Sequence, residues 1–151
     1  MFETAELGRK VGKKAFESAV PELRVQLLEL QQILRQADFP VIVLFSGVDG
    51  AGKGATVNLL NEWMDPRWIE TFAYLKASDE EQERPEFWRY WRDLPARGRF
   101  GLFLSAWYSP PFLDRVHDRI NDAEFDRRLD RIIAFERVLA DDGALILKFW
   151  M

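Results

Sequence analysis

The most constraining feature of the sequence is a glycine-rich stretch, Gly47 to Gly54, which separates an apolar segment from a helical pattern. Its spacing is that of a phosphate-binding loop, G-x-x-x-x-G-K, with Lys53 as the lysine. The apolar run 40–45 precedes the loop and the helical pattern 55–64 follows it, which is the order that such a loop requires. A glycine-rich turn with an exposed lysine is the alternative, but motif and context together favour an anion site.

Glycines allow successive backbone N–H groups to point inward, and the next helix presents the positive end of its dipole to the anion. The ammonium of Lys53 can then lie beside a phosphate. We therefore predict that the phosphate is bound at the following loop positions: Gly47, Gly50, Ala51, Gly52, Gly54 and Ala55.

One position departs from the common motif. The hydroxyl residue that usually follows the lysine and binds Mg²⁺ is replaced by Gly54. Asp49, inside the loop, could supply a carboxylate oxygen in its place, since Mg²⁺ prefers such ligands, and Thr56 is a weaker candidate. Asp49 could equally be a turn residue whose side chain bonds its own backbone. We favour the metal role for Asp49, because an uncompensated anion beside phosphates would repel them.

Composition narrows the classes of protein that remain. A chain of 151 residues is long enough for one domain with a substantial core, and a hydrophobic content of 48% argues against disorder. The net charge of −4 gives no support to nucleic-acid binding, and the absence of cysteine excludes disulfides and thiol catalysis. The first residues lack the pattern of a signal peptide, and no apolar run is long enough to span a membrane. We therefore expect a cytoplasmic protein.

Hydrophobic periodicity predicts an α/β fold. Residues 1–20 are mixed and polar and are expected to form an amino-terminal arm, followed by a domain at 21–151. Helices are predicted at 21–37, 56–64, 86–93, 112–120 and 124–140, and strands at 40–45, 68–75, 100–105 and 144–150. This alternation predicts three layers, with a parallel sheet covered by helices on both faces.

Ligands of such sheets bind beyond the carboxyl ends of the strands. The segments that follow the strands are therefore the candidate site: 47–53, 76–84 and 105–110. The chain also stops inside a predicted buried strand, so we expect it to be a fragment that is truncated at its carboxyl end.

Five arginines lie between the second and third predicted strands: Arg84, Arg89, Arg92, Arg97 and Arg99. The guanidinium fork suits phosphate oxygens and keeps its charge at any working pH. The alternative is a solvated helix whose arginines are balanced by neighbouring acidic residues. Because the group follows a phosphate loop, we favour an anionic partner and predict that Arg84 and Arg89 bind phosphate.

The strand and loop segment Val41 to Gly54 is followed by further motifs: Arg89-Tyr90, Leu94-Pro95, Trp107-Tyr108 and Leu147-Lys148-Phe149-Trp150. In this combination the chain resembles the family-2 polyphosphate kinases of the polyphosphate:AMP phosphotransferase type, in particular the amino-terminal domain of their tandem form. The resemblance implies a P-loop kinase fold that moves phosphoryl groups between polyphosphate and a nucleotide, AMP to ADP, with Mg²⁺. It also implies that Asp49 and Lys53 are catalytic, that Asp49 serves the metal and that Arg89 lies by the phosphates.

The end of the third predicted strand differs from the family pattern. Active members have Asp-Arg-Ser-Trp-Tyr there, whereas this chain has Leu104 and Ser105 in place of the aspartate and the arginine. Since phosphoryl transfer depends on positioned charges, this half is a candidate for a catalytically degenerate domain.

Two other functions stay open. One is a non-catalytic structural or phosphate-binding domain that packs against an active second domain. The other is a small-molecule nucleotide kinase, which the aspartate inside the loop disfavours. The expected partners are polyphosphate, an adenine nucleotide, and either a second homologous domain or another copy of the chain.

Overall fold

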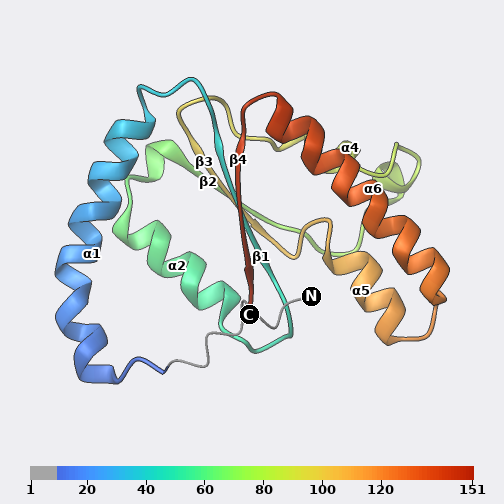
Figure 1. Ribbon diagram of the computed structural model, residues 1–151, viewed down its shortest axis with the longest axis horizontal. Coiled ribbons are helices and arrows are strands. Elements are labelled where there is room, and N and C mark those ends of the chain that lie inside the picture. The colour runs from blue at the N-terminus through green and yellow to red at the C-terminus, as the bar shows by residue number, and fades with distance from the viewer. Residues whose placement is uncertain (1–9) are drawn as a thin grey trace.

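The computed structural model describes residues 10–151, which form a four-stranded parallel sheet with helices on both faces (Figure 1). This confirms the predicted three-layer α/β architecture. The elements follow one another as α1 (Lys13–Leu34), β1 (Val41–Ser46), α2 (Lys53–Trp63), the 3₁₀ turn η1 (Pro66–Trp68), β2 (Ile69–Ala73), α3 (Asp79–Gln82), α4 (Trp88–Arg92), β3 (Phe100–Leu104), α5 (Ser109–Val116), α6 (Asp122–Asp141) and β4 (Leu145–Trp150).

Strand β1 is the central element of the sheet. The strand order is β2-β3-β1-β4, and every pairing is parallel. All six residues of β1 are buried, as expected for an apolar run without alternation. Phe45, near its end, is paired with Leu104 of β3 and with Phe149 of β4. Three strands therefore end side by side, and the loops that follow them meet at one edge of the sheet.

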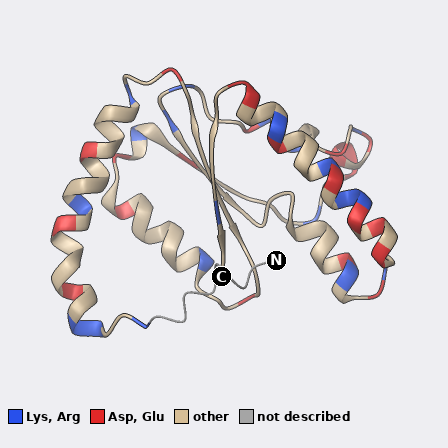
Figure 2. Ribbon diagram, viewed as in Figure 1, with Lys and Arg blue, Asp and Glu red and all other residues tan. Residues whose placement is uncertain are grey.

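Apolar side chains fill the space on each face of the sheet. On the face covered by α1 and α2, Val43 and Leu102 pack against Val57. On the opposite face, Phe103 and Trp107 pack with residues of α6. Most charged residues lie on the helices, while the strands are largely uncharged (Figure 2). The two apolar layers fix the sheet between its helices and so hold the strand ends in place.

Helix α1 is longer than the sequence predicts. It begins at Lys13, so the predicted boundary between an arm at 1–20 and a domain at 21–151 falls inside it. Residues 1–9 of that arm lie outside the described residues. Pro21 is inside the helix and leaves the carbonyl of Glu17 without its usual donor. Both positions are exposed, so water can satisfy that carbonyl.

Two other boundaries also differ from the prediction. The sequence predicts a loop at 107–111, but α5 begins at Ser109. Pro110 is compatible with this start, since it lies in the first turn, where its missing N–H would have no partner in the helix. The charged connection 76–85 contains the short helix α3. Its start is fixed by a capping box between Ser78 and Glu81, a local signal that the apolar periodicity does not contain.

Strand β4 forms one edge of the sheet and is less covered than the other strands. Leu145 is 46% exposed and Phe149 50% exposed, although both belong to an apolar segment. Within residues 10–151, no helix combines the length and the apolar character that a membrane crossing needs.

We predict that replacing Gln31 with leucine destabilises the fold. Gln31 is fully buried, and its side-chain amide donates to the carbonyl of Asp65 at 2.9 Å and accepts from the N–H of Asp65 at 2.8 Å. Leucine would leave the N–H of Asp65 without its acceptor, while the carbonyl of Asp65 keeps the N–H of Trp68 as a donor, so the loss of unfolding free energy should be about 1–3 kcal/mol. Urea unfolding measures this loss. Gln32→Leu, at an exposed neighbouring position, is the control and should change stability by less than about 0.5 kcal/mol; similar losses for both variants would contradict the prediction.

Candidate active site

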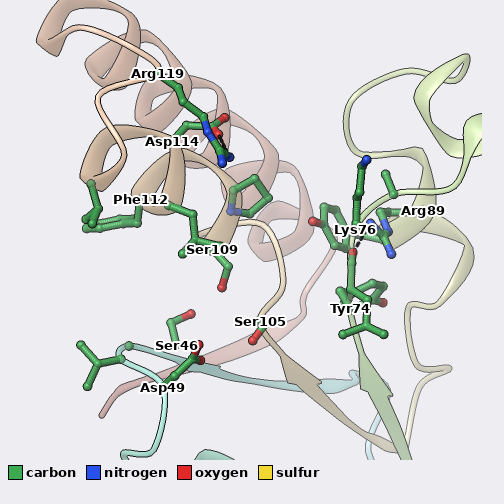
Figure 3. Close-up of a pocket in the computed structure, with 18 of the residues that line it drawn as sticks. Ser46, Asp49, Tyr74, Lys76, Arg89, Ser105, Ser109, Phe112, Asp114 and Arg119 are labelled. Carbon is green, nitrogen blue, oxygen red and sulfur yellow. Dashed lines mark hydrogen bonds and ion pairs between the residues drawn. The ribbon is translucent and has the colours of Figure 1, made fainter.

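A cavity of about 790 Å³ opens at the carboxyl ends of the strands (Figure 3). Its wall is formed by residues 46–49 after β1, residues 74–77 after β2, two residues of α4, Ser105 after β3 and one face of α5. In Figure 3, Asp49 and Ser46 lie on one side of the cavity, and Arg89 and Lys76 lie on the opposite side. Each of the three segments that the sequence predicts as a site contributes to this wall.

The phosphate loop has the backbone shape that its glycines allow. Gly47, Gly50 and Gly52 have φ values of 115°, 81° and 96°, which residues with a Cβ rarely adopt. Gly52 is the N-cap of α2 and no side chain caps that helix. The first N–H groups of α2 are therefore available to an anion, together with the positive end of the helix dipole. Of the predicted loop positions, Gly47 and Asp49 line the cavity, Gly50 to Gly52 form the bend beyond it, and Gly54 and Ala55 lie in the first turn of α2.

The start of the loop is fixed by the end of β4. The N–H of Met151 donates to the carbonyl of Ser46 at 2.9 Å, and the N–H of Val48 donates to the carbonyl of Met151 at 3.1 Å. A Cβ at Gly47 would overlap the carbonyl oxygen of Met151. Gly47 is therefore required both by its φ and by this close backbone approach.

Lys53 is held by the loop that it belongs to. Its ammonium donates to the carbonyl of Gly47 at 3.0 Å and to that of Val48 at 2.7 Å, and its side chain is only 11% exposed. The carboxylate of Asp49 is 3.7 Å from the same ammonium and is otherwise fully exposed. Asp49 thus faces the cavity, whereas Lys53 and Thr56 are not part of its wall. Two of the three N–H donors of the Lys53 ammonium are thus taken by loop carbonyls, which leaves one for a further acceptor.

The arginine segment is divided by the fold. Arg89 lines the cavity, and its Nη1 donates to the carbonyl of Leu75 at 3.1 Å. Arg84 lies outside the cavity wall, is 52% exposed and pairs with Glu80 at 3.5 Å. Arg99 lies before β3, at the opposite end of the sheet. The short helix α4 is what turns one arginine of the group toward the strand ends.

The end of β3 places an apolar and a hydroxyl side chain where the resemblance implies two charges. Leu104 packs against the apolar cluster under α1 and α2. Ser105 lines the cavity and has a φ of 52°, which is uncommon for a residue other than glycine. Strained backbone of this kind is concentrated at functional sites. The cavity therefore keeps the backbone turn at this position without the charged side chains.

The two aromatic residues after β3 differ in role: Trp107 is part of the core, and Tyr108 belongs to a polar network. Trp107 is buried, and its indole N–H donates to Glu136 at 3.1 Å. Lys148 of β4 donates to Glu136 at 2.9 Å and to the hydroxyl of Tyr108 at 3.2 Å. Burial raises the pKa of Tyr108, and the nearby Glu136 adds to this effect. Burial alone would lower the pKa of Lys148, but its hydrogen bonds to Glu136 and Tyr108 raise it. This network ties α6 and β4 to the turn that carries Ser105.

Two buried tyrosines close the inner wall of the cavity. Burial raises the pKa of Tyr90 to about 12 and also raises the pKa of Tyr74, whose hydroxyl donates to Asp93 at 3.0 Å. Both hydroxyls keep their protons at neutral pH, so neither tyrosine can act as a general base. Their rings form an apolar floor under the charged rim.

The oxygen atoms around the cavity can accommodate a hydrated magnesium ion. Among residues 10–151, no three carboxylate, histidine or cysteine side chains gather as a metal cluster. Asp49 offers one exposed carboxylate, and Ser46, Ser105 and Ser109 line the same cavity (Figure 3). Mg²⁺ commonly keeps several waters and uses one or two carboxylates together with substrate phosphates. These residues therefore fit a metal that is shared with a phosphate substrate.

Comparisons with known proteins assign the chain to a family. The family model of polyphosphate kinase 2 (PPK2) matches residues 10–151. The chain belongs to the polyphosphate kinase 2 family. This confirms the resemblance that the sequence motifs indicate, and it agrees with the position of the phosphate loop at the carboxyl end of β1.

Individual relatives support the same assignment. The chain is 54% identical over 151 residues to a polyphosphate:AMP phosphotransferase of Pseudomonas aeruginosa. The matched region covers 99% of this chain and 30% of that protein. The chain is 30% identical over 142 residues to a GDP-polyphosphate phosphotransferase of Mycobacterium tuberculosis, covering 94% and 48%. A crystal structure described as a polyphosphate kinase 2 of Pseudomonas aeruginosa has a TM-score of 0.91 at 54% identity, covering 99% and 33%. The chain thus spans less than half the length of these relatives.

Two residues at or beside the site of this polyphosphate kinase 2 domain belong to no phosphate-binding motif and are not among the residues predicted from the sequence. Arg119 lines the cavity from the turn after α5 and pairs with Asp114 at 3.3 Å. Glu81 of α3 lies 3.4 Å from Arg89. No sequence signal marks Arg119, whereas the serine three residues before Glu81 gives the pattern of a capping box.

We predict that Gly47→Ala disrupts the loop of this polyphosphate kinase 2 domain and that Gly54→Ala does not. The alanine methyl group at position 47 would displace Met151 and force a non-glycine residue to a φ of 115°, at a cost of about 2–3 kcal/mol. At Gly54 nothing lies within 4 Å of an added Cβ, and alanine in a helix gains up to about 1 kcal/mol. Unfolding free energies measured in urea check both values. Equal stability of the two variants would show that the β4 contact does not constrain the loop.

Proposed function

We propose that the chain is the phosphate-binding domain of a phosphotransferase that moves a phosphoryl group between polyphosphate and a nucleotide, with AMP giving ADP. The observation that supports this most is the cavity itself, in which the loop after β1 faces Arg89 of α4 (Figure 3). A chain of phosphates needs several positively polarised groups along its length. Lys76, Arg89 and Arg119 provide such groups around one space, and the start of α2 follows the loop segment 47–49 that forms part of its wall.

The reaction requires that the negative charge of the phosphate oxygens be stabilised while one P–O bond forms and another breaks. An oxygen of the AMP phosphate attacks the terminal phosphorus of polyphosphate, and the bond from that phosphorus to the next bridging oxygen breaks. The products are ADP and a polyphosphate shorter by one phosphate. Backbone N–H groups of the loop and the guanidinium of Arg89 would hold the phosphate oxygens in line. Lys53 would add the remaining donor of its ammonium, and bound Mg²⁺ would neutralise the charge that the oxygens share.

We further propose that this half binds phosphate but is catalytically degenerate. The support is the end of β3, where Leu104 is turned into the apolar layer and Ser105 offers only a hydroxyl. The alternative is a purely structural domain, for which an open, charged cavity of this size would have no use. A nucleotide kinase of the small-molecule kind has less support, because Asp49 occupies the loop next to its lysine.

We also propose that the domain packs against a second homologous domain or another copy of itself. The support is the apolar surface of β4, where Leu145, Leu147 and Phe149 are each at least 40% exposed at the edge of the sheet. Such an edge presents unpaired backbone groups and readily accepts a further element.

We predict that Lys53→Ala weakens polyphosphate binding at least about tenfold, since a charge-assisted contact is worth about 1.5–3 kcal/mol. The folded state should lose no more than about 1–2 kcal/mol, because the ammonium contacts two loop carbonyls but no apolar core. Titration calorimetry with polyphosphate of defined length measures the affinity. Lys14→Ala, which removes an exposed lysine of α1, is the matched control and should bind like the parent. Equal affinity of the Lys53 variant and the parent would count against the loop as a working site.

A separate prediction concerns turnover. The chain of 151 residues should form no measurable ADP from AMP and polyphosphate in the presence of Mg²⁺, because each absent preorganised charge commonly lowers the rate by about 10² to 10³. Chromatographic detection of ADP is the assay, with polyphosphate binding by the same sample as the control for a folded, competent site. Robust turnover would contradict the degenerate assignment and assign the catalytic metal to Asp49 alone.

A further inference from the structure

Arg89 is fixed at the cavity wall by contacts that do not depend on an acidic partner. Its side chain is 15% exposed, and Nη1 donates to the carbonyl of Leu75 at 3.1 Å. The guanidinium carbon lies 4.9 Å from the centre of the Tyr74 ring and 5.9 Å from that of Tyr90. A backbone acceptor and two aromatic faces therefore hold the guanidinium in one place.

The hydrogen-bonding capacity of Arg89 is not fully used. Its Nε is buried and has no hydrogen-bond partner among residues 10–151. Oε1 of Glu81 is 3.4 Å from this nitrogen, which makes an ion pair without a hydrogen bond of good geometry. A buried Nε–H without an acceptor next to an open cavity indicates an acceptor that arrives with a ligand.

Glu81 cannot complete that hydrogen bond because its carboxylate has a second task. Oε2 accepts the N–H of Ser78 at 2.9 Å, and the hydroxyl of Ser78 accepts the N–H of Glu81 at 3.3 Å. This capping box starts α3 and holds the carboxylate, which is only 13% exposed. Oε1 therefore supplies negative charge to Arg89 from a fixed distance.

We propose that Glu81 is the resident counter-ion of Arg89, whose charge limits the grip of Arg89 on polyphosphate. In the free protein, Glu81 balances the guanidinium. When polyphosphate binds, its oxygens take up the unused donor of Arg89, and Glu81 stays in its capping box as a like charge beside the ligand. This inference rests on the proposed function, since it concerns the control of the same phosphate site.

The direction of the effect follows from what else holds Arg89. Because the carbonyl of Leu75 and the ring of Tyr74 keep the guanidinium in place, removing the carboxylate of Glu81 removes charge without removing position. A fixed anion at this distance opposes any phosphate that binds to the same guanidinium. The result is weaker and more readily reversible binding of polyphosphate.

Glu81→Gln separates charge from structure. A glutamine oxygen can still accept the N–H of Ser78, so the capping box is kept while the charge is lost. Glu83→Gln is the matched control, because it removes the same charge two residues further on from an exposed side chain with no ion pair among residues 10–151. Ser78→Ala is the second control, because it weakens the capping box and keeps the charge of Glu81.

Calorimetric titration of the 151-residue chain with polyphosphate of defined length gives the test. We expect Glu81→Gln to bind about three- to tenfold more tightly than the parent, and Glu83→Gln and Ser78→Ala to bind within about twofold of it. In an Arg89→Ala background, Glu81→Gln should change the affinity less than about twofold. The remaining partner of Glu81 is then Arg92 at 3.9 Å, which does not line the cavity. A purely structural role of Glu81 could only weaken binding.

Other outcomes overturn the inference. Unchanged or weaker binding of polyphosphate by Glu81→Gln would overturn it, whether or not the thermal unfolding midpoint of the variant equals that of the parent. The same gain in Ser78→Ala would assign the effect to a loosened α3, and the same gain in the Arg89→Ala background would assign it to general charge. If the parent chain itself fails to bind polyphosphate, the proposed function fails first, which is distinguishable from a parent that binds and a variant that does not gain.

Discussion

The backbone hydrogen bonds between Met151 and the residues that flank Gly47 are the contacts on which the site depends. They extend the pairing of β1 with β4 past the last residue of β1 and into the phosphate loop. The loop can follow this path only because Gly47 has no side chain to meet the carbonyl of Met151. With the start of the loop fixed, Asp49 faces the cavity and the amide groups at the start of α2 point to the same edge of the sheet. A glycine and the residue after β4 thus set the path of the loop.

Three basic side chains at or beside the cavity have partners within the protein. Lys53 donates to two loop carbonyls, Arg89 is paired with Glu81, and Arg119 is paired with Asp114. Asp114 also accepts from Arg128 at 2.7 Å, which lowers its pKa and keeps it ionised. These partners hold the cations close to their working positions, so little side-chain entropy remains to be lost on binding. If phosphate binds here as proposed, it meets side chains that are already held in place.

Features with a local or periodic signal could be predicted from the sequence. The unbroken apolar run of β1 and the spacing of Gly47, Gly52 and Lys53 are sufficient for the sheet and the loop. The predicted start of the first helix is wrong, because α1 continues through Pro21 and the carbonyl that this proline leaves without a donor, that of Glu17, belongs to an exposed residue. The different positions of Arg84 and Arg89 depend on the short helix α4 and on the contact with Leu75, which is distant in the sequence. The ion pair of Glu81 with Arg89 also depends on tertiary structure.

The most direct measurement of the central claim is a crystal structure of the chain soaked in phosphate or sulfate. If the loop and the start of α2 form the phosphate site, the anion should lie within hydrogen-bond distance of the N–H groups of residues 50–54. An ordered loop that stays empty, with these N–H groups turned away from the cavity, would contradict the claim.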